Sequence, residues 1–204
     1  MISIDPATIG ERDVYKLLVG SVIPRPVALV TTMSDDGILN AAPYSYFNIV
    51  TADPPLLSVA IQRKQGMQKD TSRNAIAKGE FVIHIADASY LEQMNQTAAN
   101  LPPHESEVAM AGLTPVASEK ISVPGIAEAR IRMECVLEHA LPLGGTVDAP
   151  STDLLIGRVV RFHFHEAVFE ENYHIHATAL DPISRLAGHN YAKLGEQITI
   201  ERPQ

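Results

Sequence analysis

The sequence predicts one mainly β domain over residues 1–204, an antiparallel barrel with helical insertions, and three observations favour this fold. Roughly seven apolar, β-branched runs alternate with turn residues, which is typical of strands. Only two clear helical stretches are embedded among these runs, so a doubly wound parallel sheet is not expected. No internal repeat, low-complexity tract or Gly/Ser linker divides the chain, and 46% hydrophobic residues are enough for a full core.

The expected strands follow the apolar runs and end at turn residues. The segment Ser34-Asp35-Asp36-Gly37 is a hairpin signal, since Asp-Gly favours tight turns. Pro43 is expected to interrupt the next extended run, and Asp53-Pro54-Pro55 is expected to break the chain again. The strand candidates are residues 27–33, 38–42, 44–51, 56–62, 81–86, 130–141 and 154–165.

Two clear helices and two short helix candidates are expected, and the longest of the four is amphipathic, with apolar residues on one face at helical spacing. In the helix that follows a basic segment, Asp70 or Thr71 is expected to supply the N-cap. Short polar side chains serve there because they accept hydrogen bonds from the first backbone N–H groups. The four helical ranges are 13–19, 71–78, 89–100 and, within a loop-rich stretch, 106–111.

Net charge and cysteine content narrow the possible partners. Lys and Arg number 16 against 24 Asp and Glu, a formal charge of −8, so a basic surface for nucleic acid or an anionic membrane is not expected. The single cysteine, Cys135, excludes an internal disulfide, and its apolar strand pattern predicts a buried structural thiol. No signal-peptide pattern and no stretch approaching the roughly 18 apolar residues of a spanning helix are visible. We therefore expect a soluble, cytoplasmic protein.

A cluster of basic residues precedes the helix expected at residues 71–78. Helix N-termini favour anions, and Lys69, Thr71 and Ser72 are candidate donors to a bound phosphate. A solvated basic loop without a ligand is the alternative. The cluster, which occupies eleven positions of an otherwise acidic chain, consists of Arg63, Lys64, Lys69 and Arg73.

A second segment mixes aromatic and polar side chains. Tyr44, Tyr46 and Phe47 alternate closely with Ser45 and Asn48. A flat heteroaromatic ligand needs this combination, with apolar walls for its faces and hydroxyl, amide and backbone groups for its polar edge. The alternative is that the rings pack in the core, which we expect of two of the three.

Histidines offer an alternative of a different class. No dinucleotide-binding glycine motif, phosphate loop or nucleophile elbow is present. His163 and His165 share one side of an expected strand, and His174 and His176 share one side of the segment that follows. If the two segments pair as a hairpin, four imidazoles converge on a zinc, copper or iron ion. Several glutamates nearby are more typical of a solvated hairpin tip, so no metal ligand is assigned.

Segments spread in order over nearly the whole chain carry a likeness to a known family. They are Val22-Ile-Pro-Arg-Pro-Val-Ala-Leu-Val-Thr-Thr32, Asn40-Ala-Ala-Pro-Tyr-Ser-Tyr-Phe-Asn48, Asp53-Pro-Pro55, Lys69-Asp-Thr71 with Asn74, Gly79-Glu-Phe-Val82, Ala111-Gly-Leu-Thr-Pro115, Glu134-Cys135, Leu155-Ile-Gly-Arg-Val159, and Arg185-Leu-Ala-Gly188 followed by Tyr191. This ordered set resembles the flavin reductase-like family, the FMN-binding split barrels that include flavoredoxin and the reductase components of two-component monooxygenases.

The resemblance implies a six-stranded Greek-key split barrel that forms a homodimer and binds FMN non-covalently near the dimer interface. On this basis Lys69 and Thr71 hold the phosphate, and Arg25 is a further candidate. The isoalloxazine ring and ribityl chain are lined by a strand end and the loop after the next strand, namely Thr31, Thr32, Ala42, Tyr44, Ser45, Tyr46 and Asn48.

The activity that the resemblance implies is hydride transfer from NADH or NADPH to FMN. The reduced flavin then serves a partner monooxygenase or another electron acceptor. Because stacking of the two rings leaves little for side chains to do, no catalytic residue is assigned. The alternative is a flavoredoxin-like electron carrier that binds FMN without productive nicotinamide turnover. Oxidation of NADH or NADPH in the presence of added flavin separates the two.

Overall fold

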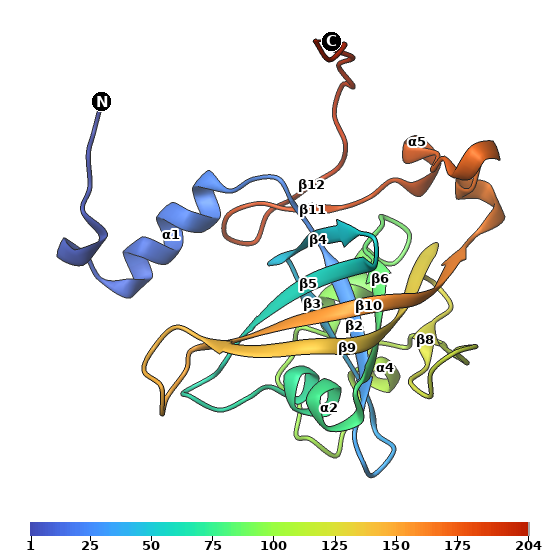
Figure 1. Cartoon of the computed structure of the whole chain (residues 1–204), viewed down its shortest axis with the longest axis horizontal. Coiled ribbons are helices and arrows are strands. Elements are labelled where there is room, and N and C mark those ends of the chain that lie inside the picture. The colour runs from blue at the N-terminus through green and yellow to red at the C-terminus, as the bar shows by residue number, and fades with distance from the viewer. Residues whose placement is uncertain (204) are drawn as a thin grey trace.

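Seven antiparallel strands form the central sheet of the computed structural model, which describes residues 1–203 (Figure 1). Their spatial order is β3-β2-β6-β9-β10-β5-β4. The mainly β, antiparallel fold with helical insertions is confirmed, and the sheet holds one strand more than the six expected. The strands are β2 (Ala28–Met33), β3 (Leu39–Tyr44), β4 (Phe47–Ala52), β5 (Pro55–Gln62), β6 (Glu80–Ile85), β9 (Ile131–Leu143) and β10 (Thr152–Phe164).

Short elements surround this sheet. The two-residue strands pair among themselves, β1 with β11, β11 with β12, and β7 with β8. They are β1 (Arg25–Pro26), β7 (Pro115–Val116), β8 (Gly125–Ile126), β11 (Ser184–Arg185) and β12 (Tyr191–Ala192). The α-helices are α1 (Glu11–Ser21), α2 (Asp70–Lys78), α3 (Leu91–Gln96), α4 (Glu107–Met110) and α5 (Ala177–Leu180), and 3-10 turns occupy Pro6–Thr8, Glu166–Val168 and Glu171–Tyr173.

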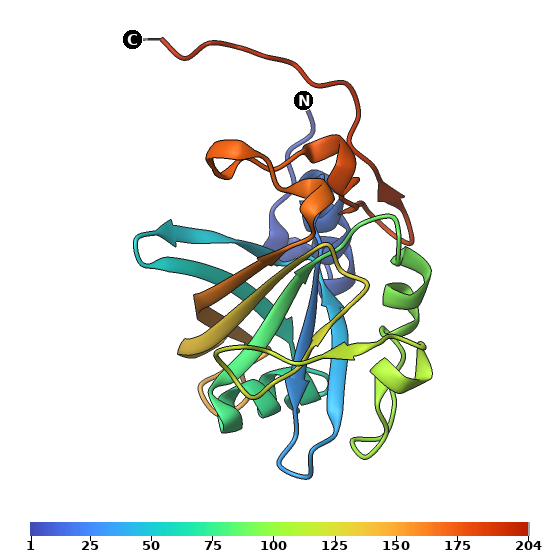
Figure 2. The same ribbon diagram turned by 90° about the vertical axis from the view of Figure 1, so that its right-hand side faces the viewer.

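The sheet curls because its two outer strands are consecutive in the chain. Only Ser45 and Tyr46 separate β3 from β4, and the N–H of Ala60 in β5 donates to the Tyr46 carbonyl over 2.8 Å. The two edges of the sheet therefore meet at this turn. Beyond it β4 and β5 lean away from β2 and β3, so the barrel is split along this side (Figure 2).

The expected break at Pro43 is wrong. β3 continues through Pro43 to Tyr44, and Pro43 lies opposite Leu29 of β2. The N–H of Ala41 points away from β2, where it donates to Glu107, and residue 43 faces the same way because backbone groups alternate along a strand. The N–H that proline lacks therefore belongs to the outer edge of the sheet, where no ladder bond is lost.

Side-chain alternation along β2 creates a core on each of its two faces. Ala28 and Val30 point into the barrel. Leu29 points outward and is covered by the insertion between β6 and β9, where Tyr90 and Met94 pack. Because both faces are buried, this strand is apolar over most of its length.

The barrel interior also contains residues that the sequence singled out. Two of the three aromatic residues of the mixed segment, Tyr44 and Phe47, belong to the interior cluster, as expected. Cys135 lies there too, on β9, with no exposed surface. Burial raises the pKa of its thiol, so the reactive thiolate is suppressed and the expected structural thiol is confirmed.

Helix α2 closes one end of the barrel and packs against β2, β3, β6 and β9 (Figure 1). The expected N-cap is wrong, because the helix begins one residue earlier, with Lys69 in the N-cap position and no side-chain cap. Asp70 instead pairs with Arg73, and the Thr71 hydroxyl is bonded inside the protein. The helix ends at Gly79, whose φ of 73° is the left-handed conformation that favours glycine.

Helices α1 and α4 are close to their expected positions, α3 is shorter than expected, and α5 was not predicted. Helix α3 starts after a turn in which Asp87 accepts bonds from the backbone and hydroxyl of Ser89. It ends where the Thr97 hydroxyl donates to the Met94 carbonyl over 2.7 Å. The sequence did not predict β1, β11 and β12, because two-residue strands carry no periodic pattern.

The four histidines do not converge. His163 Nε2 lies 2.6 Å from Glu134 Oε1, whereas His165 and His176 accept backbone N–H bonds that cap two separate short helices. The chain after β10 folds into these helices rather than into a strand that returns beside β10. Among residues 1–203 no three His, Cys, Asp or Glu side chains are grouped to hold a metal ion. The hairpin geometry on which the histidine alternative depended is wrong.

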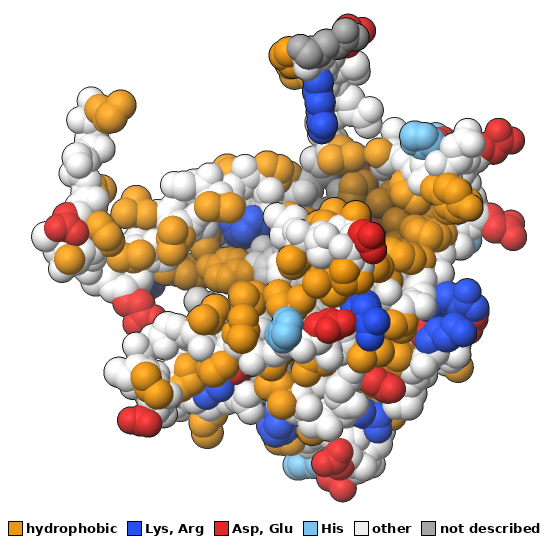
Figure 3. All heavy atoms as spheres, in the orientation of Figure 1, with side chains coloured by type: hydrophobic (Ala, Val, Ile, Leu, Met, Phe, Trp, Pro, Cys, Tyr) orange, Lys and Arg blue, Asp and Glu red, His pale blue; other side chains and the backbone are white. Residues whose placement is uncertain are grey.

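Helix α1 packs on the rest of the chain only near its C-terminal end. Val19 is its one buried residue, while Leu17 and Leu18 are 45% and 57% exposed. Strand β4 likewise exposes Ile49 and Val50. Figure 3 shows hydrophobic side chains along α1 and over the neighbouring part of the sheet. The described chain therefore leaves two apolar surfaces uncovered.

Candidate functional site

Three adjoining cavities form one groove at the split in the barrel. Pro43 and Tyr44, at the end of β3, line all three. The first cavity, of about 430 Å³, lies between the basic loop (residues 63–69) and α4. The second, of about 750 Å³, lies beside α3 and the β11–β12 turn, and the third, of about 160 Å³, lies beside α1. The first and second cavities are each of the size typical of cofactor sites.

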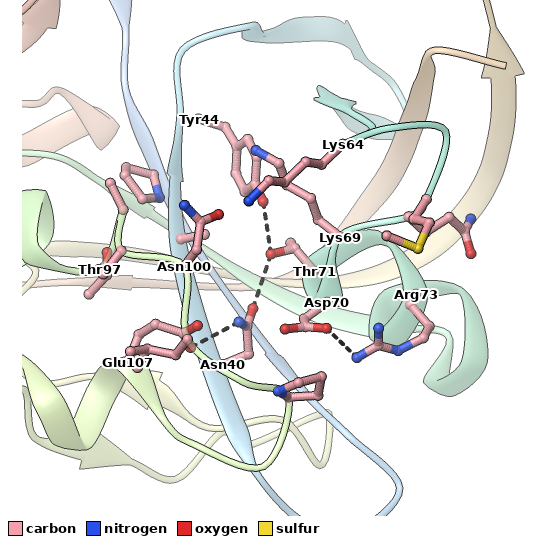
Figure 4. Close-up of a pocket in the computed structure, with 18 residues that line it drawn as sticks. Asn40, Tyr44, Lys64, Lys69, Asp70, Thr71, Arg73, Thr97, Asn100 and Glu107 are labelled. Carbon is pink, nitrogen blue, oxygen red and sulfur yellow. Dashed lines mark hydrogen bonds and ion pairs between the residues drawn. The ribbon is translucent and has the colours of Figure 1, made fainter.

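A chain of hydrogen bonds forms the floor of the first cavity (Figure 4). The Tyr44 hydroxyl donates to Thr71 Oγ1 over 2.9 Å, and the Thr71 hydroxyl donates to Asn40 Oδ1 over 3.0 Å. The Asn40 amide donates in turn to Glu107 Oε2 over 2.9 Å. Within residues 1–203 every buried side-chain polar atom has a partner, so these groups are held in fixed orientations.

Burial controls the ionisation of this floor. It raises the pKa of Tyr44 to about 12, so the phenol stays protonated and acts as a donor. Burial also raises the pKa of Glu107, although hydrogen bonds from its own backbone N–H, from Ala41 and from Asn40 oppose the shift. The floor thus has fixed dipoles and one carboxyl group whose Oε2 already accepts from Asn40 and Ala41.

The four basic residues of the cluster fall into two classes. Arg63 pairs with Asp153, and Arg73 pairs with Asp70. Lys64 and Lys69 have no carboxylate partner within 4 Å among residues 1–203, and both line the first cavity. The protein therefore leaves two cations uncompensated at one end of the groove.

Lys69 is held in a setting that favours an anion. Its ammonium lies 5.9 Å from the centre of the Tyr44 ring, and Figure 4 shows the side chains of Lys64 and Lys69 extending toward Tyr44 from the same loop. Burial lowers the pKa of Lys69, and the positive charge of Lys64 lowers it further. A bound anion relieves both effects, since it stabilises the charged ammonium.

The start of α2 adds backbone donors beside these lysines. The first intrahelical bond runs from the N–H of Arg73 to the Lys69 carbonyl, so the N–H groups of residues 70–72 precede it. These groups and the helix dipole favour negative charge. The hydroxyls are not available in the same way, because Thr71 is bonded in the floor and Ser72 donates to the Lys69 carbonyl.

Arg25 holds the walls of the third cavity together. Its guanidinium donates to the carbonyls of Val19 and Val22 at the end of α1, and to the Leu186 carbonyl in the C-terminal segment. Its Nε lies 3.3 Å from Ser45 Oγ in the β3–β4 turn. These contacts use four of its five N–H donors. Arg25 therefore joins three distant segments and has one donor left for a ligand.

The far wall of the second cavity comes from α3 and the C-terminal segment. Asn95 of α3 and the C-terminal residues Arg185, His189 and Tyr191 line it. The Arg185 guanidinium carbon lies 4.5 Å from the centre of the Tyr191 ring, and the Tyr191 hydroxyl donates to Asn95 Oδ1 over 3.3 Å. The wall thus offers a cation, an imidazole and aromatic surface.

The structure brings most of the predicted FMN-binding residues together. Three do not line the groove: Thr31 donates to the Pro124 carbonyl under the insertion, Thr32 lies below the floor, and Asn48 is exposed on β4. Alternation along β2 explains the first two, because it turns one side chain outward and the next inward. The predicted residues that line the groove are Arg25, Ala42, Tyr44, Ser45, Tyr46, Lys69 and Thr71.

Several groove residues were not predicted. The sequence could have indicated Lys64, since it belongs to the basic cluster, but it was not assigned a role in the site. Asn40 and Arg185 lie in segments that carried the family likeness. Asn100 and Glu107 come from the insertion between β6 and β9, and only the tertiary fold brings them to the groove.

Comparison with known proteins places this groove in a family. Residues 19–183 match the model of the flavin reductase like domain. The chain belongs to the flavin reductase-like family. Its members bind flavin and act as oxidoreductases. No helix within residues 1–203 is both long enough and apolar enough to cross a membrane.

Solved structures and curated relatives extend this assignment over the whole flavin reductase-like chain. Nitrilotriacetate monooxygenase component B from Bacillus cereus is 66% identical, with a TM-score of 0.97 and 98% of each chain covered. The 2-nitrobenzoate 2-nitroreductase NbaA from Pseudomonas fluorescens is 30% identical, with a TM-score of 0.87 over 99% of this chain and 96% of that one. The uncharacterized protein YwrF of Bacillus subtilis (strain 168) is 52% identical over 96% of each chain.

Proposed function

We propose that the protein is an FMN-binding, NAD(P)H-dependent flavin reductase that passes hydride from nicotinamide to flavin. The groove carries this proposal, because it has two uncompensated lysines at one end and a mixed aromatic and polar trough beside them. The lysines suit a phosphate, and the trough suits a flat heteroaromatic ring. FMN combines these two features in one molecule.

The residues present fit FMN in charge and in hydrogen-bonding chemistry. Lys64 and Lys69, with the backbone N–H groups at the start of α2, would hold the phosphate. Pro43 and Tyr44 supply apolar surface for the ring system, and the outer edge of β3 supplies backbone groups for its polar edge. Ser45, held by Arg25, adds a hydroxyl at the turn.

Bound FMN supplies the redox chemistry, since it accepts a hydride from NADH or NADPH. The chain contributes binding and orientation, and we assign no catalytic residue. We assign the second cavity to the nicotinamide nucleotide, because it adjoins Tyr44 and carries a cation, Arg185, that suits phosphate groups.

A partner protein, a dimer and a location complete the proposal. A 66% identical relative is described as component B of a monooxygenase, which supports delivery of reduced flavin to a monooxygenase or another electron acceptor. The exposed apolar faces of α1 and β4 support a homodimer, since short helices are marginal without packing. We place the protein in the cytoplasm, where nicotinamide nucleotides are available.

The test is an anaerobic titration of the purified protein with FMN, followed by addition of NADH or NADPH and recording of the visible spectrum. Bound oxidised flavin that bleaches with a nicotinamide nucleotide is the expected result. Binding without bleaching favours the electron carrier. Absence of FMN binding contradicts both functions.

A matched pair of lysine variants tests the assignment of the phosphate site. Lys69→Gln should weaken FMN binding by about tenfold or more, because a charge-assisted bond to the phosphate is lost. Lys78→Gln, at the other end of α2, removes the same charge away from the groove and should leave the FMN dissociation constant unchanged. Equal effects of the two variants contradict a phosphate site at Lys69.

A further inference from the structure

We propose that Asp153, which lies outside the groove, positions the basic loop for its anion by clamping Arg63 and Gln68. The inference rests on the proposed function, since the anion is taken to be the FMN phosphate. Asp153 is a positioning residue, because its carboxylate reaches the loop and not the cavity. The loop it holds carries Lys64 and Lys69.

The clamp is a partly buried bidentate ion pair whose carboxylate is buried. Asp153 lies on β10 opposite Ile61 of β5, and its side chain is 3% exposed. Arg63 Nε lies 3.1 Å from both carboxylate oxygens, and its NH2 group lies 2.6 Å from Oδ1. This fork geometry fixes the orientation of the guanidinium as well as its distance.

The same carboxylate holds the second end of the loop. Gln68 Nε2 lies 3.4 Å from Asp153 Oδ1. Between Arg63 and Gln68 the chain forms a tight turn in which Lys64 and Met67 exchange two backbone hydrogen bonds of 3.0 Å. Both ends of the turn that presents Lys64 are therefore tethered to one buried side chain in the sheet.

The turn itself has the geometry of a two-residue hairpin loop. Gln65 and Gly66 have φ values of 53° and 77°, the pair of positive values that a two-residue hairpin of this type requires. Arg63 NH1 lies 3.5 Å from the Gly66 carbonyl oxygen, so the clamped guanidinium also reaches the turn. Movement of Arg63 is therefore expected to move Lys64.

The clamp also divides the charges of the loop. Asp153 neutralises Arg63, and Asp70 neutralises Arg73, so the two lysines carry the charge that faces the cavity. Without Asp153, Arg63 becomes a mobile cation beside Lys64, and the spacing of charges around the anion is no longer fixed. A misplacement of this kind weakens contacts to a phosphate and leaves contacts to the ring intact.

The experiment compares FMN with riboflavin, which has the same ring system and ribityl chain but no phosphate. Asp153→Asn keeps the size of the side chain and removes its charge. We expect the FMN dissociation constant to rise by about tenfold or more, and the riboflavin dissociation constant to change by less than about twofold. Fluorescence quenching of each flavin by the purified full-length protein gives both values.

Three further variants serve as checks. Arg63→Lys keeps the positive charge but removes the bidentate guanidinium contacts, so it should weaken FMN binding selectively, as Asp153→Asn does. Gln68→Leu removes the second tether, and keeps the test possible if Asp153→Asn does not fold. Glu138→Gln breaks the 2.7 Å pair between β9 and Arg158 of β10, away from the loop, and should leave both flavins unaffected.

The outcomes separate a positioning role from a structural one. Equal weakening of FMN and riboflavin in the clamp variants, or no weakening of either, overturns the role of Asp153 and leaves the proposed function standing. If the unmodified protein binds neither flavin, the proposed function fails and the clamp proposal fails with it. Selective loss of FMN in Asp153→Asn and Arg63→Lys supports the clamp.

Discussion

Helices α1 and α2 are similar in length but differ in how much of their surface packs against the rest of the chain. The nine residues of α2 bury Thr71, Ser72 and Ala75 against the barrel. The eleven residues of α1 bury only Val19 and leave an apolar face open. The comparison shows that α2 packs within the chain, whereas α1 has an apolar face that the described chain does not cover.

The largest expected effect concerns the open face of α1. Leu18→Asp places a charge at its most exposed leucine, and a charge buried in a dimer interface is costly. We expect the dimer dissociation constant to rise by about a hundredfold or more. Light scattering should then report a species near 22.2 kDa, the mass of one chain.

Val147→Asp is the matched control for that substitution. Val147 is 99% exposed at the turn between β9 and β10, so the same charge there should leave the dimer intact. If Leu18→Asp stays dimeric as well, or if the unmodified protein is monomeric, α1 does not need a second copy and the contrast with α2 is broken.

The next effect concerns the packed face of α2. Thr71→Val keeps the shape and removes the hydroxyl that accepts from Tyr44 and donates to Asn40. The free energy of unfolding should fall by about 2 kcal/mol, because buried polar groups lose a partner. Ser21→Ala, which removes an exposed hydroxyl at the C-terminal end of α1, should change it by less than about 0.5 kcal/mol. Urea unfolding measures both.

Two glycines give smaller effects of opposite sign. Gly79 ends α2 with a φ of 73°, so Gly79→Ala should lower the free energy of unfolding by about 1 kcal/mol. Gly20 lies inside α1 with nothing within 4 Å of an added methyl group, so Gly20→Ala should raise it by about 0.5–1 kcal/mol. Thermal unfolding that shows the same sign for both contradicts the assignment of their conformations.

The smallest effect concerns pH and the start of α2. Burial and Lys64 lower the pKa of Lys69, and a bound phosphate should raise it again by favouring the charged form. The complex then binds more protons than the free protein, so FMN affinity should fall as pH rises through the lowered pKa of Lys69. The change for one group is less than about tenfold per pH unit.

Riboflavin again provides the control for this titration. Its ring ionises as that of FMN does, so the ratio of the two affinities isolates the phosphate. A ratio that stays constant as pH rises through the lowered pKa of Lys69, toward the usual lysine value of about 10.4, contradicts an anion site at Lys69. If this affinity ratio changes more steeply with pH in the unmodified protein than in Lys69→Gln, the result supports an anion site at the charged start of α2, in contrast to the uncharged face of α1.

Much of the barrel could be predicted because its strands obey local rules. Alternation and β-branched residues located β2, β5, β6, β9 and β10 to within a few residues. The break predicted at Pro43 was wrong because the effect of a proline depends on whether its position faces a neighbouring strand. β3 pairs with β2 alone, and Pro43 faces the free edge. The order of strands cannot be derived from local patterns.

The positive charge of the candidate site could be predicted from the sequence, but the ion pairs and hydrogen bonds among its residues could not. The basic cluster indicated an anion before the fold was known, yet Arg63 is neutralised by Asp153, which lies ninety positions away in the sequence. The Thr71 hydroxyl was expected to donate to a phosphate. Helix α2 begins one residue earlier than predicted, and the hydroxyl points toward the floor of the first cavity, where it donates to Asn40. Such pairings depend on tertiary contacts.

The burial of Cys135 makes the chain suitable for site-specific labelling. An alkylating reagent needs an accessible thiolate, and the native barrel provides neither access nor ionisation at this position. A cysteine introduced on α1 would therefore take a fluorophore alone, without prior removal of the natural residue. Modification of Cys135 itself in mild denaturant would report how often the barrel opens.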